Sequence, residues 1–105
     1  SPHQLKQKES EIDNLVYDPE THINTIFNKI QNFQDICQLV NQPKKDYQLV
    51  NMAYIIIQKV PIFHDSLIRW NKRVENKTYA DFKLYMRNEF NEIGKVGGLT
   101  IGNSS

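Results

Sequence analysis

The histidines of this sequence are too far apart to suggest a metal site. His3, His22 and His64 have no second ligand three or four residues away, a spacing that zinc protease motifs and zinc knuckles require. Asp65 follows His64 directly and would be a candidate to orient its imidazole, but adjacent residues point in different directions around a helix. We therefore expect neither a metal ion nor a histidine acting as general base.

The single cysteine, Cys37, belongs to an apolar stripe and is predicted to be a buried structural thiol rather than a nucleophile. One cysteine cannot form an internal disulfide, so we expect a reducing, cytoplasmic location. The four glycines fall near the end of the chain, without the helix and lysine that a phosphate-binding loop needs. The sequence thus indicates that the protein is not an enzyme, and we expect no cofactor and no small-molecule substrate.

A cluster of basic residues is the strongest charge feature. On two adjacent helices it would form a surface that contacts phosphates, and its candidate members are Arg69, Lys72, Arg73, Lys83 and Arg87. Acidic residues such as Glu75 and Asp81 dilute it, and the net charge of +1 gives no overall field that attracts nucleic acid. A solvated face with local ion pairs and a surface for nucleic acid or an acidic protein both remain open.

The composition is that of a single globular domain. Of the 105 residues, 39% are hydrophobic and 24% are charged, which is near the globular average. The longest apolar stretch, residues 52–57, is far shorter than the roughly 20 residues of a membrane helix, so we expect no membrane contact. The chain begins without methionine and ends on Gly-Asn-Ser-Ser, which suggests a piece of a longer polypeptide.

Helical periodicity is clearest in the first half of the chain. Asp18-Pro19-Glu20 has the residue types of a helix start, and apolar residues then recur every three or four positions as far as Val40. Asn41-Gln42-Pro43 is expected to end this helix. A second helix is predicted over residues 45–59, apolar almost all round, although 54–57 alone would also fit a buried strand.

Two further helices are predicted in the second half. Pro61 begins a short one, in which Phe63, Leu67, Trp70 and Val74 recur at helical spacing. Thr78 and Asp81 resemble a capping box at the start of the next, which Gly94, Gly97 and Gly98 are expected to end.

These elements predict an all-α protein, a four- to five-helix bundle. Residues 1–16 are expected to be an N-terminal extension or weak helix, 17–94 the helical domain and 95–105 a flexible tail. The side chains expected to build the core are Phe27, Phe33, Tyr54, Phe63, Leu67, Trp70, Tyr79, Phe82 and Phe90.

Two stretches of the sequence are familiar when taken together. Tyr17-Asp18-Pro19 is followed by Ile26-Phe27-Asn28-Lys29-Ile30, and Trp70-Asn71-Lys72 by Lys77-Thr78-Tyr79-Ala80-Asp81-Phe82-Lys83. They resemble the capsid region of Gag proteins from long-terminal-repeat retroelements, over roughly residues 16–96. The shared feature is hydrophobic spacing rather than a chemical signature.

The resemblance implies a capsid-type lobe in which Trp70, Tyr79, Phe82 and Phe90 pack the helices together. It also implies a partner, because Gag chains assemble into shells around RNA, and related Arc-type lobes bind peptides. The sequence departs from the family at Tyr79, where tryptophan is usual, and in having no Cys-Cys-His-Cys zinc knuckle. That absence puts direct RNA packaging by this segment in doubt.

We therefore expect a non-enzymatic, capsid-like module that forms homo-oligomers, and ultimately virus-like particles, through weak contacts. Two alternatives stay open. One is a helical module that binds nucleic acid through the basic residues, and the other is an adaptor lobe that binds a linear peptide in a groove between helices.

Overall fold

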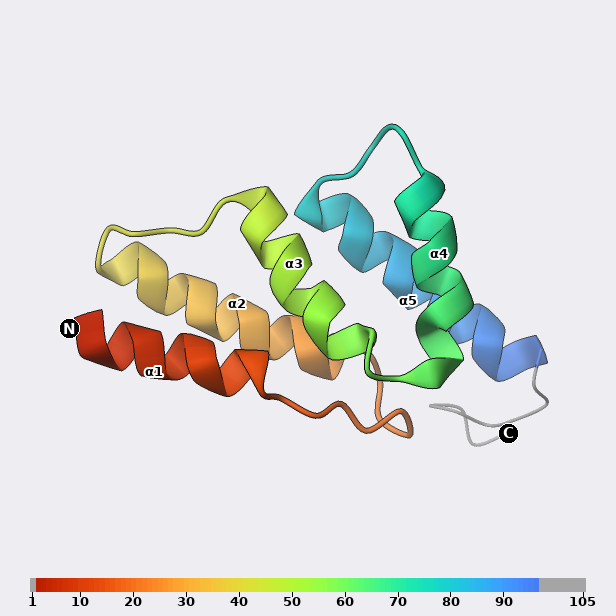
Figure 1. Ribbon diagram of the computed structural model, residues 1–105, viewed down its shortest axis with the longest axis horizontal. Helices are drawn as coiled ribbons and strands as arrows, with labels where there is room; N and C mark the ends of the chain where they lie inside the picture. The colour runs from red at the N-terminus through yellow and green to blue at the C-terminus, as the bar shows by residue number, and fades with distance from the viewer. Residues whose placement is uncertain (1, 97–105) are drawn as a thin grey trace.

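A computed structural model describes residues 2–96 as an all-α bundle, which confirms the predicted fold class (Figure 1). The described residues form five α-helices and one short 3₁₀ helix. Their bounds are α1 Pro2–Asp13, α2 Asn24–Leu39, α3 Asp46–Ile57, η1 Pro61–Phe63, α4 His64–Lys72 and α5 Tyr79–Val96. Helices α1 and α2 lie side by side and run in opposite directions, and α4 and α5 lie at the other end of the molecule.

The first long helix starts later than the sequence suggested. Helix α2 begins at Asn24, whereas Asp18 forms a turn: its Oδ1 accepts a hydrogen bond from the amide of Glu20 at 2.9 Å, and its carbonyl accepts one from the amide of Thr21. An aspartate that bonds the amide two residues on favours a turn over a helix. Tyr17, whose hydroxyl donates to the Thr21 carbonyl, anchors this turn in the core.

The end of α2 is close to the prediction. Asn41 adopts a left-handed backbone conformation with φ of 61°, which asparagine tolerates better than most residues. The side chain of Gln34 then holds the following loop, because it accepts from the amide of Lys44 at 2.9 Å and donates to the carbonyl of the same residue at 3.0 Å. The loop is thereby fixed against α2 before α3 begins.

Helix α3 is the central element, as its pattern predicted. It covers residues 46–57 rather than 45–59, and the segment 54–57 is helical, not a strand. Ala53, Ile56 and Ile57 are completely buried. Tyr54, which the sequence placed in the core, is only half-buried: its hydroxyl lies at the surface, where it accepts a hydrogen bond from the Asn71 side chain at 2.8 Å.

The capping box at the start of α5 is confirmed. The amide and hydroxyl of Thr78 both donate to Asp81 Oδ2, at 3.1 and 2.7 Å, and the amide of Asp81 donates back to Thr78 Oγ at 3.1 Å. The other end of this helix differs from the prediction. It continues through Gly94 to Val96, because one glycine lowers helix stability by only about 1 kcal/mol. Residues 97–105 of the predicted tail lie outside the described part.

Helix α4 is shorter than predicted and ends at Lys72, so Val74 is not part of its apolar stripe but lies in the loop, 89% exposed. The chain turns there because Arg73 takes up an extended backbone conformation.

The core joins all five helices. Except for Tyr54, every side chain predicted for it is buried: Phe27, Phe33, Phe63, Leu67, Trp70, Tyr79, Phe82 and Phe90. Ile12 of α1 and Tyr17 belong to the same cluster. Helix α1, within the predicted extension or weak helix, therefore packs on the core of the bundle. Over the described residues, no helix has both the length and the apolar character needed to span a membrane.

Candidate functional site

Trp70 is the centre of an aromatic cluster that joins α4 to α5. Its ring centroid lies 4.9 Å from that of Phe82, edge to face, and 5.4 Å from that of Tyr85. Arg73 and Lys77 place their cationic groups 5.3 and 5.4 Å from the same ring, within the range of cation–π attraction. Only 3% of Trp70 is exposed, so it is an internal anchor and offers no stacking surface to a nucleobase.

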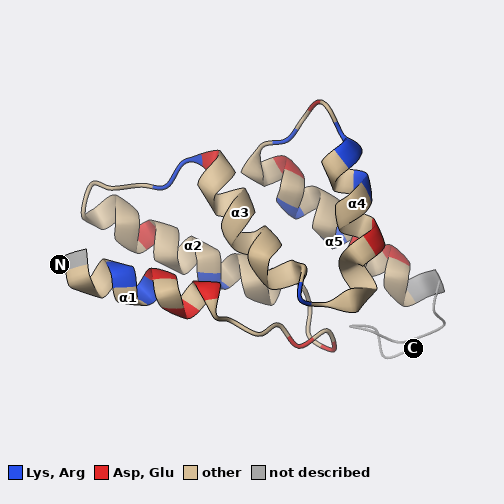
Figure 2. Ribbon diagram, in the orientation of Figure 1, with Lys and Arg blue, Asp and Glu red and all other residues tan. Residues whose placement is uncertain are grey.

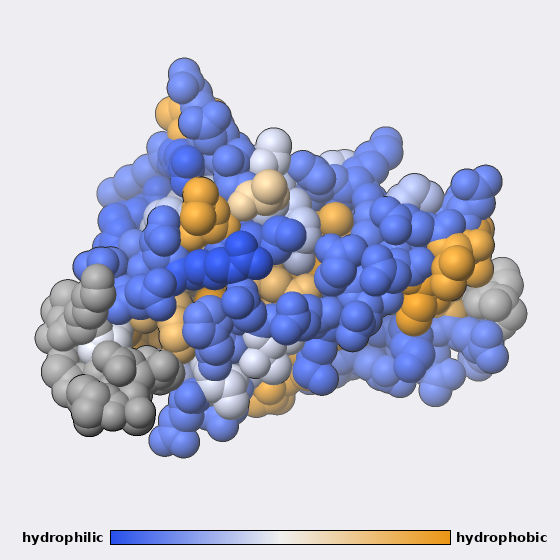
Figure 3. Space-filling view, turned by 180° about the vertical axis from the view of Figure 1, so that it is seen from behind, coloured by the Kyte–Doolittle hydropathy of each residue, from blue (hydrophilic) through white to orange (hydrophobic). Residues whose placement is uncertain are grey.

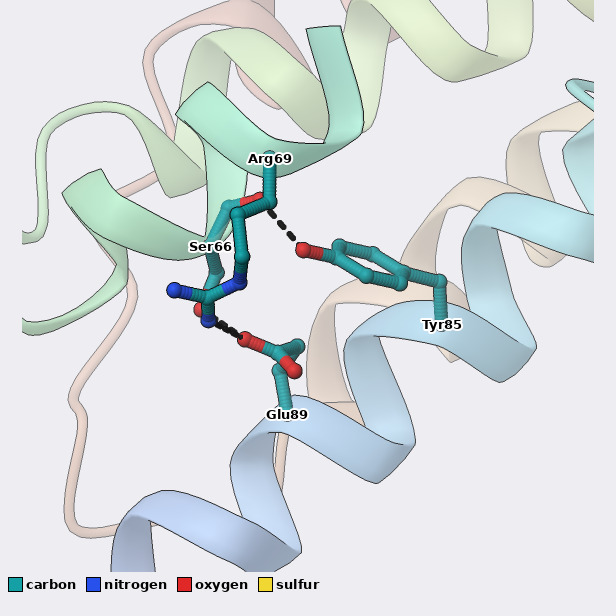
Figure 4. A network of polar contacts seen from close by, with 4 residues as sticks. All are labelled: Ser66, Arg69, Tyr85 and Glu89. Atoms are coloured by element: carbon teal, nitrogen blue, oxygen red, sulfur yellow. Dashed lines mark hydrogen bonds and ion pairs between the residues drawn. The ribbon is translucent and has the colours of Figure 1, made fainter. Parts of the chain in front are cut away.

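A polar network also links α4 to α5 (Figure 4). Ser66 Oγ donates a hydrogen bond to Glu89 Oε1 at 2.6 Å, and Arg69 donates to the same oxygen. The hydroxyl of Tyr85 donates to the Ser66 carbonyl at 2.6 Å. Burial raises the pKa of Tyr85, and the hydrogen bond to Glu89 raises the pKa of Arg69. Both shifts favour the neutral phenol and the charged guanidinium that the hydrogen bonds require.

This network has a structural role, although it places a serine beside a carboxylate. A nucleophilic serine needs an adjacent base and access to substrate. Ser66 is only 1% exposed. The nearest histidine in sequence, His64, has its Nε2 3.0 Å from the carbonyl of Gln58 instead. The network therefore fixes α4 against α5 and does not resemble a catalytic triad.

The basic residues that the sequence suggested as one surface are divided between two sides of α5. Arg69 meets Glu89 on one side of this helix. Arg87 precedes Glu89 by two residues, a separation of about 200° around a helix, so Arg87 and Lys83 lie on the opposite side. Figure 2 shows the basic end of α4 apart from the basic residues of α5. The continuous basic patch that the sequence predicted is therefore not formed.

On the side facing α2, the basic residues of α5 contact neighbouring side chains. Arg87 donates from Nε to Asn24 Oδ1 at 2.6 Å and lies 5.8 Å from the ring of Phe27. Lys83 lies 4.7 Å from the ring of Tyr79. Lys72 is exposed in the last turn of α4, where a cation is favoured by the helix dipole. Most of the predicted patch thus serves packing within the bundle.

The structure brings together no metal-binding set. In the part of the chain that it describes, no three or more His, Cys, Asp or Glu side chains are grouped to hold an ion. His22 packs on Phe90, with ring centroids 4.6 Å apart, and its Nδ1 accepts from the amide of Asn24. Cys37 is fully buried, and this burial raises the pKa of its thiol, which makes it a poor nucleophile.

An apolar groove between α1 and α2 is the surface feature that the sequence did not reveal. It consists of two adjoining hollows of about 280 and 510 Å³, which share Lys8, Glu11 and Ile36 as walls. Its apolar lining residues are Leu5, Ile12, Leu15, Phe33, Ile36, Leu39 and Val40. Leu39 is 85% exposed. Figure 3 shows apolar side chains gathered at the end of the molecule where α1 begins and α2 ends.

The sequence pattern does not reveal the groove, because it misplaces one of the lining residues and does not mark another. The pattern assigns Val40 to the buried stripe of α2, whereas this side chain is 43% exposed at the helix end. Leu39 lies beside that stripe and is not marked by it. The available signal is in the first fifteen residues, where Leu5, Ile12 and Leu15 recur at helical spacing. A helix there must lie against a neighbour, and the edge between the two becomes a groove.

Comparison with family models, curated proteins and solved structures finds no match to this chain.

Proposed function

We propose that this chain is a non-enzymatic assembly module, a Gag-type capsid domain whose copies associate through weak repeated contacts in the cytoplasm. The observation that carries the proposal is the apolar groove between α1 and α2. An apolar surface with a polar rim is typical of a protein-docking site. Leu39 illustrates the point, because a side chain of this size that is 85% exposed contributes little to the stability of the isolated bundle.

The packing of α4 on α5 supports the Gag-type identity. The resemblance implies that Trp70, Tyr79, Phe82 and Phe90 hold the helices of a capsid lobe together, and all four side chains are buried. Trp70 and Phe82 are in direct contact. These four side chains thus pack inside the bundle, and the groove between α1 and α2 stays available for contacts between copies.

The size of the groove favours weak contacts. A stable interface between two proteins takes about 20–30 residues from each partner, whereas 13 residues line the two hollows of the groove. Shells use many such contacts at once, and their combined strength comes from multivalency. We accordingly expect a monomer in dilute solution and association as the concentration rises.

The alternatives have less support. A nucleic-acid function through the predicted basic residues is disfavoured because Arg69 is bound to Glu89 and because Lys83 and Arg87 lie on the other side of α5. A peptide-binding adaptor would use the same groove, since an amphipathic helix can lie between two helices. The two functions differ in what they require: self-association depends on the concentration of this chain alone, whereas an adaptor needs a separate peptide.

The test is sedimentation velocity of the 105-residue chain over a wide range of concentration, at low and high salt, with and without RNA. Growth of the sedimentation coefficient with protein concentration alone supports the assembly module. A chain that stays monomeric and shifts only when RNA is added at low salt would contradict it and would favour nucleic-acid binding.

A further inference from the structure

We propose that the groove between α1 and α2 binds the same groove of a second copy, with the two α1 helices antiparallel about a twofold axis. The proposal rests on the assembly function above and names the surface that starts the assembly. In a twofold contact, if one residue of the first copy meets a second residue of the other copy, then the second residue of the first copy also meets the first residue of the other. The surface must therefore be complementary to itself.

The order of residues along the groove edge of α1 meets this requirement. Leu5, Lys8, Glu11 and Leu15 all line the groove. The spacing of the first three places them on one face of α1, and Leu15 follows two residues after this helix ends at Asp13. Read from the other end, the same edge is again apolar, charged, charged of opposite sign, and apolar. In the antiparallel arrangement Leu5 of one copy lies near Leu15 of the other, and Lys8 lies near Glu11.

The charges at the centre of this edge are available to a second copy. The side chains of Lys8 and Glu11 are 56% and 59% exposed, and they are 4.0 Å apart within one chain, which is the outer limit of an ion pair. An exposed pair of this kind contributes about 0.2–1 kcal/mol. It is therefore readily exchanged for two reciprocal pairs between copies, Lys8 with Glu11 and Glu11 with Lys8.

Helix α2 supplies the apolar floor of the same contact. Ile36 is shared by both hollows, and Leu39 extends from the end of α2 beside Leu5. The one further charged side chain in the lining is Lys29, near Leu15, where its hydrocarbon stem can cover an apolar neighbour while the ammonium group stays in water. Glu9 is on another edge of α1, where it is paired with Lys44 at 3.1 Å. The groove thus brings two α1–α2 pairs together as a four-helix arrangement.

The experiment uses two single charge reversals, Lys8→Glu and Glu11→Lys, in the full chain. Each variant alone places like charges opposite one another in both reciprocal pairs, so its self-association should weaken at least about tenfold. An equimolar mixture of the two variants restores both pairs in a mixed dimer, because the two carboxylates of the first variant then face the two ammonium groups of the second. Sedimentation equilibrium of each variant and of the mixture, at low salt, measures these effects.

Recovery of association in the mixture supports the twofold pairing, because a contact between this groove and a different surface is not rescued by mixing. If the single variants associate as the wild type does, or if the mixture stays as weak as the single variants, the pairing is overturned while self-association stands. A wild-type chain that never associates would instead overturn the assembly function itself. Leu39→Ser should also weaken association about tenfold, whereas Val74→Ser, an 89% exposed control outside the groove, should not.

Discussion

The two ends of this bundle use their large side chains in opposite ways. Where α4 meets α5, Trp70 is 3% exposed and is enclosed by other aromatic rings. Ser66, Arg69 and Glu89 satisfy one another in the adjoining network. Where α1 meets the end of α2, Leu39 is 85% exposed and lines a groove that no other segment of the described chain fills. The junction of α4 and α5 thus encloses its largest aromatic side chain, whereas the groove between α1 and α2 leaves apolar side chains open to solvent.

This difference indicates which residues hold the fold and which are available to a partner. Substitutions at the α4–α5 junction should lower the free energy of unfolding, because they open cavities or leave polar groups unpaired. Substitutions in the groove should leave that free energy nearly unchanged and alter association instead. The predictions below test this division, beginning with the largest expected loss of stability.

Trp70→Ala should lower the free energy of unfolding by about 3–5 kcal/mol, because it removes the largest side chain at the α4–α5 junction and leaves a cavity. Urea denaturation followed by circular dichroism measures the change. Phe82→Leu is a milder change at the same junction, because it retains an apolar side chain beside Trp70. It should lower the free energy of unfolding by less than Trp70→Ala does. An unchanged midpoint for Trp70→Ala would show that the junction does not anchor the bundle.

Glu89→Ala should cost about 1–3 kcal/mol, because the hydroxyl of the buried Ser66 loses its acceptor and Arg69 loses its ion pair. Glu20→Ala is the matched control, since it removes the same group from an exposed turn. Thermal unfolding of both variants, compared at one pH and salt concentration, measures the difference. Equal melting temperatures would mean that the network contributes nothing to the contact between α4 and α5.

The sequence was sufficient to predict the part of the fold in which local pattern and packing agree. Phe82 and Phe90 recur at helical spacing and are buried, and Thr78 with Asp81 forms the expected capping box. These features depend on neighbours along the chain, so a sequence pattern contains them. The all-α class followed from the same periodicity.

The candidate surfaces were less predictable, because they depend on how helices are placed in space. Nothing in the spacing of Arg69 shows that its guanidinium meets Glu89 twenty residues later. The predicted start of α2 is wrong because Asp18 and Pro19 suit a turn as well as a helix end, and the hydrogen bond from Glu20 decides for the turn. The groove escapes prediction because it exists only once α1 lies beside α2.

Thr78→Ala should lower stability by about 1 kcal/mol, since it removes the side chain that accepts the amide of Asp81 at the start of α5. The effect should depend on pH. Hydrogen bonds from Thr78 hold the pKa of Asp81 below its ordinary value of 3.8. A depressed carboxyl pKa stabilises the fold above the unfolded pKa, and this contribution is lost as the pH falls through the folded pKa.

Urea midpoints measured from pH 6 to pH 2 therefore distinguish the contribution of the Thr78 cap from that of an exposed threonine elsewhere on the surface. The wild-type chain should lose stability below about pH 4 more steeply than Thr78→Ala, because the variant removes the main cause of the depressed pKa. Thr25→Ala, an exposed threonine of α2, should keep the wild-type slope. Identical slopes in all three chains would show that the Thr78 cap has no part in the acid response.

Leu39→Ser should change the free energy of unfolding by no more than about 0.5 kcal/mol, the smallest effect in the series, because a side chain that is 85% exposed has little packing to lose. The measurement must be made well below the concentration at which the wild type associates, since dimerisation stabilises the folded state by mass action. At higher concentration the wild type should gain stability and the variant should not. A large loss in the dilute monomer would place Leu39 among the residues that hold the fold and would remove the contrast between the two ends of the bundle.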